Sequence, residues 1–444
     1  MGEGVGLEFL PSMIEIIPYQ PGVQNAKLEA ILSRSNEFTP EIEAAVREIV
    51  AAVRAQGDEV LAAFTWKFDR VHLRPDAFRV TGAEIDAACR AVDPDLLDAL
   101  RAAADNIRRF HEPQRVHSYF VNDGDGVILG RRALPIGRVA ILIPGASAPL
   151  FSTVLMAAIP AQVAGVPQVC MATPPQPDGR VHPAVLAAAR IAGVQEVYRV
   201  FGAQAVAALA YGTETIPKVD KIVGPGNPYV QMAKKIVFGD VGIEMLAGPS
   251  EIVVLADESA HPRHVAADLL SQAEHGSGFE ASVCITPSET LAKKVRDEVI
   301  RQTERLPRAG AVRKALDNFG AILVVPDLSA GVDLVNRIAP EHVELLVARP
   351  WEWLDRIQNA GAVFLGPASS EPVGDYFAGT NHILPTNGAA RFASSLGVGD
   401  FLKTISVVAY TQGRLAKTAD KIVKLAEAEG LEAHAAAIRA RFER

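Results

Sequence analysis

Apolar side chains recur at helical spacing through the first part of the chain. Between about Thr39 and Phe68 they fall three or four residues apart, with one interruption at Gly57, and this pattern predicts an amphipathic helix. A similar pattern continues from Ala83 to Phe110. We therefore expect residues 1–136 to form a helical region that contributes to a first α/β domain.

From Gly137 onward, short apolar runs alternate with helical runs. The strand candidates are RVAILIP, QVCMAT, EVYRVFG and DKIVGPGN in one block, and EIVVLAD, ASVCITP, AILVVPD, VELLVA and AVFLGP in a second block from Glu251. Alternating strands and helices indicate parallel sheets with helices on their faces, and strands with few polar positions are typical of such buried sheets. We predict an α/β fold with two parallel-sheet, incomplete Rossmann-like domains, over residues 137–249 and 250–390.

The tail, residues 391–444, has a different pattern. It carries one helical segment, from Leu415 to Phe442, and no strand run that could pair with it. A tail of this kind often packs on another domain or on another subunit. We expect a helical C-terminal extension that crosses to a partner.

Composition and charge limit the class of protein. With 444 residues, of which 49% are apolar and 22% charged, the chain has the composition of a globular protein with more than one core. The net charge of -8 and the lack of a Lys/Arg block argue against nucleic-acid or membrane partners. The N-terminus lacks a basic start and an unbroken apolar run, so we expect no signal peptide and a cytoplasmic protein.

The cysteines do not indicate a disulfide framework or a cysteine-based zinc site, because Cys89, Cys170 and Cys284 lie far apart in the sequence. Cys170 and Cys284 sit in apolar, strand-like runs without an activating base beside them. We interpret both as core residues rather than as aldehyde-oxidising nucleophiles.

Two short segments bring together side chains that could carry chemistry. Gln272 and His275 are three residues apart on a predicted helix and share one face; imidazole is the commonest metal ligand, and an amide oxygen can join it. Glu341 and His342 follow Pro340 at the start of a strand run and could serve as paired general bases. Taken alone, the two segments are better explained as an ordinary helix and a solvated Glu–His pair.

Three further segments are also candidates. The loop Gly374–His382 follows a strand run and offers Asp375 and His382 as ligands, although it could be an ordinary loop. Glu429 and His434 lie on the Ala-rich tail, where a lone His is usually a surface residue. Gly224–Asn227 follows a strand and opens a helix, so its N–H groups could approach a phosphate, while the usual Gly-rich phosphate signatures are absent.

Together these fragments resemble the histidinol dehydrogenase family over nearly the whole chain. The matching blocks, in the family's order, are GDEVLAAFTWKFD, PGASAPLFSTVLM, GAQAVAALAYGTETIPKVDKIVGPGN, AGPSEIVVLAD, DLLSQAEHG, PEHVEL and GDYFAGTNHILPT. The resemblance implies a zinc-dependent, NAD-linked enzyme that oxidises L-histidinol to L-histidine through histidinal, the last step of histidine biosynthesis. It also implies a homodimer with shared active sites and one Zn²⁺ per subunit.

The resemblance assigns roles residue by residue. It implies zinc ligands at Gln272, His275, Asp375 and His434, the last of them from the tail of the other subunit. It implies Glu341 and His342 as the acid/base residues, with His342 taking the hydroxyl proton and Glu341 activating water. The substrate would be held by Ser250, Gln272, His275, His342, Asp375, Glu429 and His434, and NAD by Leu142, Gln204 and Asn227.

Three positions depart from the family's pattern around the expected cofactor site. Leu142 stands where the family commonly has Tyr, and Ala146 and Phe201 stand where it commonly has Gly. Weaker or shifted NAD binding, or compensation by Phe201, would both be consistent with these changes. Competing hypotheses are a related dehydrogenase of another amino or hydroxy alcohol, a zinc hydrolase that uses Glu341, and a binding protein without turnover.

Overall fold

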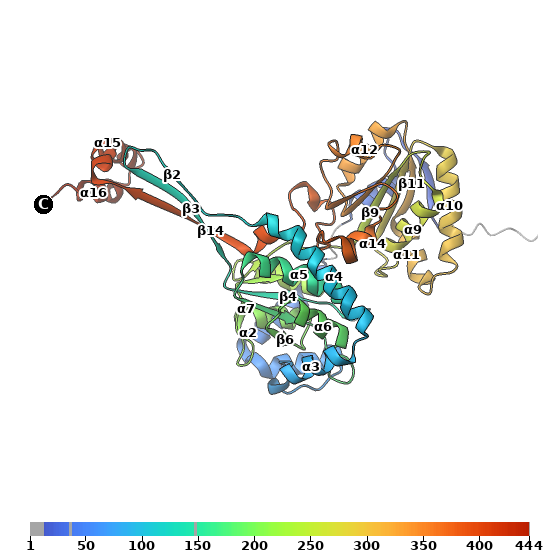
Figure 1. Ribbon diagram of the computed structural model, residues 1–444, viewed down its shortest axis with the longest axis horizontal. Coiled ribbons are helices and arrows are strands. Elements are labelled where there is room, and N and C mark those ends of the chain that lie inside the picture. The colour runs from blue at the N-terminus through green and yellow to red at the C-terminus, as the bar shows by residue number, and fades with distance from the viewer. Residues whose placement is uncertain (1–12, 35–37, 146–148, 444) are drawn as a thin grey trace, which may run out of the picture.

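The structure, a computed structural model, describes residues 13–34, 38–145 and 149–443. Figure 1 shows two α/β domains next to each other and an arm that extends from the first domain, away from the second. The predicted fold class is confirmed: two parallel sheets, a helical N-terminal part and helices in the C-terminal tail.

The first domain is built on a five-stranded parallel sheet with the order β6-β5-β4-β7-β8. Its strands are β4 (Arg138–Leu142), β5 (Gln168–Ala172), β6 (Glu196–Tyr198), β7 (Lys221–Val223) and β8 (Gly242–Ile243). One face is covered by α3 (Gly82–Ala91), α4 (Pro94–His111), α5 (Phe151–Ala164) and α6 (Pro183–Ile191), the other by α2 (Pro40–Asp69), α7 (Ala203–Tyr211) and α8 (Pro228–Val237). Because side chains alternate along a strand, Ile141 enters one core and Leu142 the other.

The second domain has a six-stranded parallel sheet with the order β1-β11-β10-β9-β12-β13. Its strands are β1 (Glu15–Pro18), β9 (Glu251–Ala256), β10 (Ala281–Thr286), β11 (Gly320–Val324), β12 (His342–Leu346) and β13 (Ala362–Leu365). Helices α9 (Pro262–Ala273), α10 (Glu289–Thr303) and α11 (Ala309–Phe319) pack on one face, and α1 (Ala26–Leu32), α12 (Leu328–Ile338) and α13 (Trp351–Leu354) on the other. Every residue of β9, β10 and β12 is buried, as expected of parallel strands between helical layers.

The start of the chain differs from the sequence expectation. Residues 13–34 belong to the second domain, because β1 pairs with β11 and the side chains of Leu28 and Ile31 enter that domain's core. Only from α2 onward do the N-terminal helices cover the first sheet. A four-residue run such as β1 carries no signal for its partner strand, since that partner lies far away in the sequence.

The arm also differs from the sequence expectation of a tail without strands. Its antiparallel sheet has the order β14-β3-β2, from β2 (Tyr119–Asn122), β3 (Val127–Pro135) and β14 (Leu402–Tyr410), and it leads to α15 (Gln412–Ala428) and α16 (Glu432–Arg439). The strand β14 pairs with β3 over its full length, from Leu402 opposite Pro135 to Tyr410 opposite Val127. Its partner again lies far away along the chain. Because β14 mixes apolar residues with Lys403, Thr404 and Ser406, it lacks the continuous apolar run that marks the core strands.

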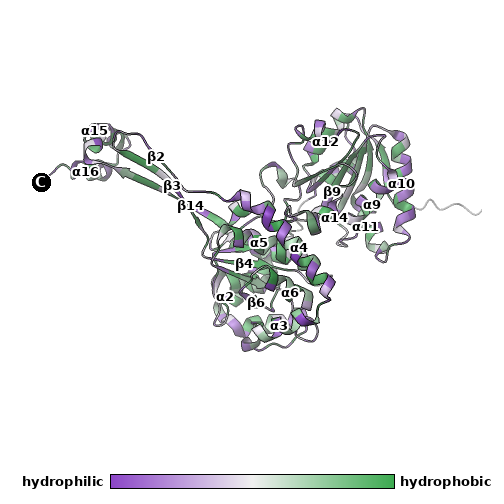
Figure 2. Cartoon of the chain, viewed as in Figure 1, coloured by the Kyte–Doolittle hydropathy of each residue, from purple (hydrophilic) through white to green (hydrophobic). Residues whose placement is uncertain are grey.

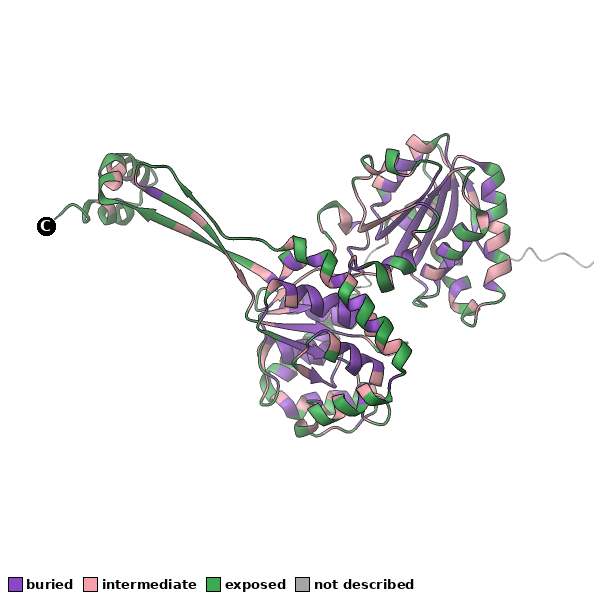
Figure 3. Cartoon of the chain, viewed as in Figure 1, coloured by how far each residue is buried: buried purple, intermediate pink, exposed green. Residues whose placement is uncertain are grey.

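The arm combines apolar strands with high exposure. Figure 2 shows hydrophobic positions along β2, β3 and β14, and Figure 3 shows much of the same ribbon as exposed, unlike the purple sheets of the two domains. The exposed apolar residues of the arm strands include Tyr119, Phe120, Val121, Ile128, Leu129, Ile405 and Val408. A strip of this kind marks an interaction surface more often than a free surface.

The remaining short elements lie in the connections. They are the 3₁₀ turns Pro75–Ala77, Glu112–Gln114, Ala389–Arg391 and Val398–Phe401, and α14 (Glu371–Val373) with the π-helical turn Gly374–Ala378 that follows it. Among the described residues, no helix has the length and apolar character needed to span a membrane.

Hydrogen bonds between segments of the two domains hold them together. Asn381 donates from Nδ2 to the carbonyl of Met156 on α5 at 2.7 Å, and the N–H of Gly248 donates to Thr386 Oγ1 at 2.6 Å. The linker after β8 and the returning segment after the π-helical turn are thereby fixed to each other. The functional candidates lie beside these two segments.

Candidate functional site

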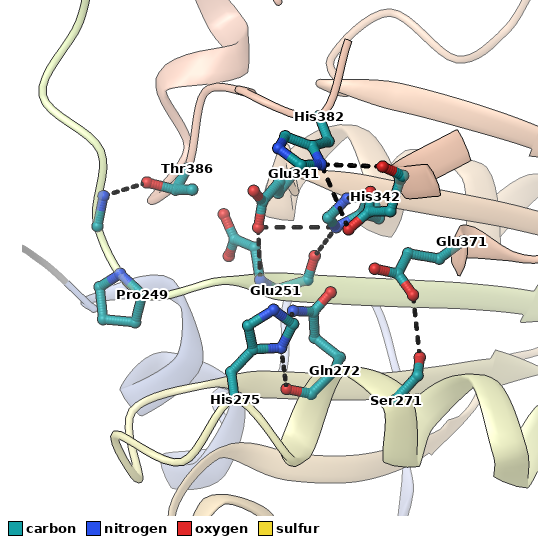
Figure 4. Close-up of polar contacts among 12 residues, drawn as sticks. Pro249, Glu251, Ser271, Gln272, His275, Glu341, His342, Glu371, His382 and Thr386 are labelled. Atoms are coloured by element: carbon teal, nitrogen blue, oxygen red, sulfur yellow. Dashed lines mark hydrogen bonds and ion pairs between the residues drawn. The ribbon is translucent and has the colours of Figure 1, made fainter. Parts of the chain in front are cut away.

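The candidate acid/base residues lie where β9 and β12 begin. Strands β9 and β12 are neighbours in parallel register, with His342 opposite Ile252. His342 therefore starts β12, and Glu341 directly precedes it, beside the first residue of β9, Glu251. Figure 4 shows both side chains directed at Glu251. The exposed fractions are 6% for Glu341 and 3% for His342, so both groups work in a medium from which water is largely excluded.

The backbone of Glu251 holds both side chains. Its N–H donates to Glu341 Oε2 at 3.0 Å, and its carbonyl lies 3.1 Å from His342 Nδ1. Because a carbonyl can only accept, Nδ1 carries the proton of this hydrogen bond. His342 Nε2 is then the nitrogen left for chemistry; it is buried, has no hydrogen-bond partner among the described residues, and lies 3.8 Å from Asp375 Oδ1.

Burial and mutual charge set the protonation of this pair. Burial raises the pKa of Glu341 to about 7, although the neighbouring His342 opposes the shift. Burial acts to lower the pKa of His342, but Glu341 and Asp375 outweigh it and raise that pKa to about 10. The site thus contains a carboxyl that titrates near neutral pH beside an imidazole that readily holds a proton, a combination suited to proton transfer.

Gln272 and His275 lie on the other side of the same site, at the end of α9. His275 Nδ1 is 3.1 Å from the backbone carbonyl of Gln272 and 3.3 Å from the side-chain Nε2 of the same residue, so both contacts use Nδ1 and leave Nε2 free to bind a metal. The side chain of Gln272 is fully buried, and its Oε1 has no hydrogen-bond partner among the described residues. An unpaired buried oxygen is costly, and a bound cation would satisfy it.

Asp375 lies in the π-helical turn and offers a third ligand. Burial alone would raise the pKa of Asp375, but its neighbours His342 and His382 lower it to about 2, so this carboxylate is ionised at neutral pH. An amide oxygen, an imidazole nitrogen and a carboxylate together fit the donor set of Zn²⁺ and related cations.

Glu371 was not predicted from the sequence. It is 4% exposed and accepts from Ser271 Oγ at 3.2 Å. The ligand atoms of His342, Glu371 and Asp375 all lie within 4.8 Å of one another, which makes this group a second possible set of metal donors. Burial and the charge of Asp375 raise the pKa of Glu371 to about 8. Its position four residues before Asp375 is one helical turn, a signal that could have indicated it.

His382, which the sequence offered as a ligand, has both ring nitrogens in use. Its Nδ1 is 3.1 Å from the backbone carbonyl of Asp375 and therefore donates. Its Nε2 lies 3.1 Å from Thr153 Oγ1 on α5 and accepts from that hydroxyl. His382 thus connects the turn of Asp375 to the first domain.

Glu429 and His434 are not brought to this site within the chain. Glu429 follows α15 and His434 lies on α16; both are exposed. Figure 1 places these helices at the tip of the arm, at the opposite end of the molecule from α9 and α14. Within one chain, the two residues cannot contact Gln272, His275 or Asp375.

The cofactor candidates lie at the carboxyl ends of the first domain's strands. The chain runs from β4 outward to β5 and β6 and then crosses to β7 on the other side of β4. Such a switch point between neighbouring strands is where ligands bind in open α/β sheets. Leu142 ends β4, and Asn227 caps α8 after β7, accepting from the N–H of Val230 at 3.1 Å.

The side chains at these positions are mostly buried. Leu142 is fully buried and Gln204, in the first turn of α7, is 2% exposed. Phe201 is half-buried against the same core as Leu142, while Ala146 lies outside the described residues. The side chain of Leu142 therefore belongs to the core, and only its backbone borders the switch point.

A cavity of about 320 Å³ connects the two halves of the site. Asn227 and Gln231 line it from the first domain, Ser250 from the linker, and Ser277 and Phe279 from the second domain. It places Ser250, a predicted substrate residue, between the cofactor candidates and the segment that follows His275.

Comparisons with known proteins agree with this geometry. The family model described as histidinol dehydrogenase matches residues 32–442. The histidinol dehydrogenase of Moorella thermoacetica is 54% identical over 90% of this chain and 95% of its own length, and that of a Synechococcus species is 50% identical over 97% and 99%. The crystal structure of the Elizabethkingia anophelis enzyme of that name superposes with a TM-score of 0.89, at 39% identity over 97% of each chain. This chain belongs to the histidinol dehydrogenase family.

Proposed function

We propose that this protein is a cytoplasmic enzyme that oxidises L-histidinol to L-histidine through histidinal, with Zn²⁺ and NAD, as the last step of histidine biosynthesis. The observation that carries the proposal is the Glu341–His342 pair, held by the backbone of Glu251. It faces His275 and Gln272, whose buried Oε1 has no hydrogen-bond partner among the described residues. Family membership over nearly the whole chain supports the choice of substrate.

Zinc would be held by Gln272 Oε1, His275 Nε2 and the Asp375 carboxylate, with His434 of the partner subunit as the fourth protein ligand. These donors fit because Gln272 Oε1 is buried without a partner and Asp375 is ionised. A bound Zn²⁺ would supply a template for the amine and imidazole of the substrate and a Lewis acid beside the reacting carbon.

The two oxidations would divide the work between two neighbouring groups. In its neutral form His342 has Nε2 free to take the hydroxyl proton when the alcohol is oxidised. A cation bound to Asp375 would offset one of the negative charges that raise the pKa of His342 and so favour this neutral form. Glu341, with its pKa raised to about 7, is placed to take a proton from the water that adds to the aldehyde. Each oxidation delivers two electrons to NAD, which supplies the hydride acceptor. Because water adds directly to the aldehyde, the second oxidation needs no cysteine nucleophile. Cys170 and Cys284 are buried, in agreement with that conclusion.

The arm supports a homodimer with shared sites. Its strands expose apolar side chains, and the helices at its tip carry Glu429 and His434. A second copy of this chain would cover those side chains. A two-fold arrangement would bring each tip to the partner's Gln272, His275 and Asp375, whereas the same residues stay apart within one chain.

We expect the purified protein with Zn²⁺, NAD and L-histidinol to form two NADH for each histidinol consumed, measured by absorbance. His275→Ala should lose most of the bound metal, measured by atomic emission, and nearly all NADH formation. His264→Ala, on the same helix but outside the donor set, is the matched control and should keep both. Turnover without NAD would contradict the proposed reaction and indicate a hydrolase, and full metal content in His275→Ala would contradict the ligand assignment.

Shared sites predict that two inactive chains complement each other. In a heterodimer of His434→Ala and His275→Ala chains, one of the two sites has every ligand. After subunit exchange we expect about one quarter of the parent NADH formation, because about half of the dimers are mixed.

The control for this experiment mixes His275→Ala with Asp375→Ala, whose residues lie in the same half of the site. No site is then complete, so activity should stay at background. Native mass spectrometry confirms that subunits have exchanged. The shared-site arrangement is contradicted if both mixtures recover the same activity, or if the His434→Ala and His275→Ala mixture recovers no activity after exchange.

The division of acid/base roles predicts unequal losses in Glu341→Gln. The amide can still accept from the N–H of Glu251, but it cannot take a proton from water. Oxidation of histidinal should fall by roughly 10²–10⁴-fold, and oxidation of histidinol to the aldehyde much less, measured in single-turnover experiments with each substrate. The control is Glu344→Gln, which removes another buried carboxylate from β12 and should not change the ratio of the two oxidation rates. Equal losses with histidinol and histidinal would show that Glu341 does not act at the water step.

A further inference from the structure

Lys234 and Glu244 form a fully buried ion pair behind the Gly224–Asn227 loop. Lys234 Nζ lies 2.7 Å from Glu244 Oε1, and the side chains are 0% and 1% exposed. Lys234 lies on α8, and Glu244 directly follows β8. Removing both charges from water is costly, and a buried ion pair is weak evidence for a gain in stability. An ion pair at this place is therefore better explained by a role in fixing the position of neighbouring groups than by a gain in stability.

Both charged groups contact the backbone of one residue, Gly224. Lys234 Nζ donates to the carbonyl of Gly224 at 3.0 Å, and Glu244 Oε1 accepts from its N–H at 2.7 Å. Both hydrogen-bonding groups of this peptide segment are thus satisfied by charged partners, which form stronger hydrogen bonds than neutral ones.

The opposite side of Gly224 is closed by β4. Gly224 has φ +119°, and a Cβ atom there would lie 2.4 Å from the carbonyl oxygen of Leu142. The residue is therefore held between the last peptide of β4 on one side and the ion pair on the other. This is the switch point of the first sheet, where the chain leaves β7 for the N-terminus of α8.

The same face of α8 also holds the linker to the second domain. Asn227, Gln231 and Lys234 follow one another at spacings of four and three residues and so share a face of the helix. Gln231 Oε1 accepts from the N–H of Ala247 at 3.1 Å. The linker that begins with Glu244 and ends at Ser250 is therefore fixed to the helix that carries the cofactor loop.

We propose that Lys234 and Glu244 are positioning residues for NAD, which hold the Gly224–Asn227 loop in the conformation that receives the cofactor. The inference rests on the proposed NAD-linked function. The pair does not touch the cavity between the domains, whose lining includes Gly226, Asn227 and Gln231. It acts through the backbone of Gly224.

The test removes both charges together in Lys234→Met/Glu244→Gln. The Gln oxygen can still accept from the N–H of Gly224, but the carbonyl of Gly224 loses its donor. With the zinc-loaded full-length protein, we expect the Kd for NADH by titration calorimetry and the KM for NAD to rise about tenfold, equivalent to about 1.4 kcal/mol. The KM for histidinol and the zinc content should change by less than about twofold, since neither depends on this loop.

The matched control is Arg138→Met/Glu196→Gln. Arg138 and Glu196 form a similar ion pair, 12% and 18% exposed, at the amino ends of β4 and β6 in the same sheet. A purely structural role predicts that both double variants lower the melting temperature and that neither changes the affinity for NADH. The positioning role predicts that only Lys234→Met/Glu244→Gln changes it.

An unchanged Kd for NADH in folded Lys234→Met/Glu244→Gln overturns the inference. If that variant does not fold, Lys234→Arg gives the same comparison. It keeps a positive charge beside Glu244, but a guanidinium cannot take the place of the single ammonium that contacts both Gly224 O and Glu244 Oε1. Unchanged NADH affinity in Lys234→Arg overturns the inference equally. If the parent protein itself fails to bind NADH and to reduce NAD, the proposed function fails, and this inference fails with it.

Discussion

Two hydrogen bonds from the peptide of Glu251 organise the candidate site. One fixes the carboxylate of Glu341, and the other fixes the protonated nitrogen of His342. They exist because β9 and β12 are adjacent parallel strands in a register that sets His342 opposite Ile252, so that residues 341 and 342 lie beside Glu251. The side chain of Glu251 is in turn held by Arg34 at 2.9 Å and by the N–H of Asn387 at 2.7 Å. The orientation of the acid/base pair thus depends on backbone groups that cannot rotate away.

The electrostatic character of the site follows from that arrangement. Glu341, Glu371 and Asp375 gather around His342 in surroundings that exclude water, and burial raises the pKa of the first two carboxyls. Such a concentration of negative charge is costly without a counter-charge. A divalent cation at Gln272, His275 and Asp375 would supply it and would also pair the unsatisfied Gln272 Oε1. The proposed metal binding and the proton chemistry would therefore be two aspects of the same buried charge distribution.

The sequence predicted what depends on local pattern. Apolar runs identified the core strands, and the short spacing placed the side chains of Gln272 and His275 together, although α9 ends at Ala273 and His275 lies in the turn that follows it. The adjacency of Glu341 and His342 was visible in the sequence. The backbone of Glu251, which orients both side chains, comes from a strand far away in the sequence. Glu371 was missed although it lies one helical turn before Asp375, because only the fold brings it to His342.

Non-local pairing also explains the differences in the fold. The strand β1 joins the second sheet and β14 pairs with β3, and neither partner could be read from the short runs themselves. At Leu142 the pattern showed only an apolar residue where relatives were expected to have Tyr. The side chain of Leu142 is buried in the core, whereas its carbonyl oxygen lies against Gly224. At this position the backbone, and not the side chain, therefore borders the candidate cofactor site.

The central claim is that one catalytic site is assembled from two copies of this chain around a metal ion. Anomalous X-ray diffraction at the zinc edge, on crystals of the zinc-loaded protein, measures this most directly. The account predicts one anomalous peak per subunit, bound by Gln272, His275 and Asp375 of one chain and by His434 of the partner subunit. A peak bound by His342, Glu371 and Asp375 instead, or a metal held by residues of one chain alone with both arm tips free, would contradict it.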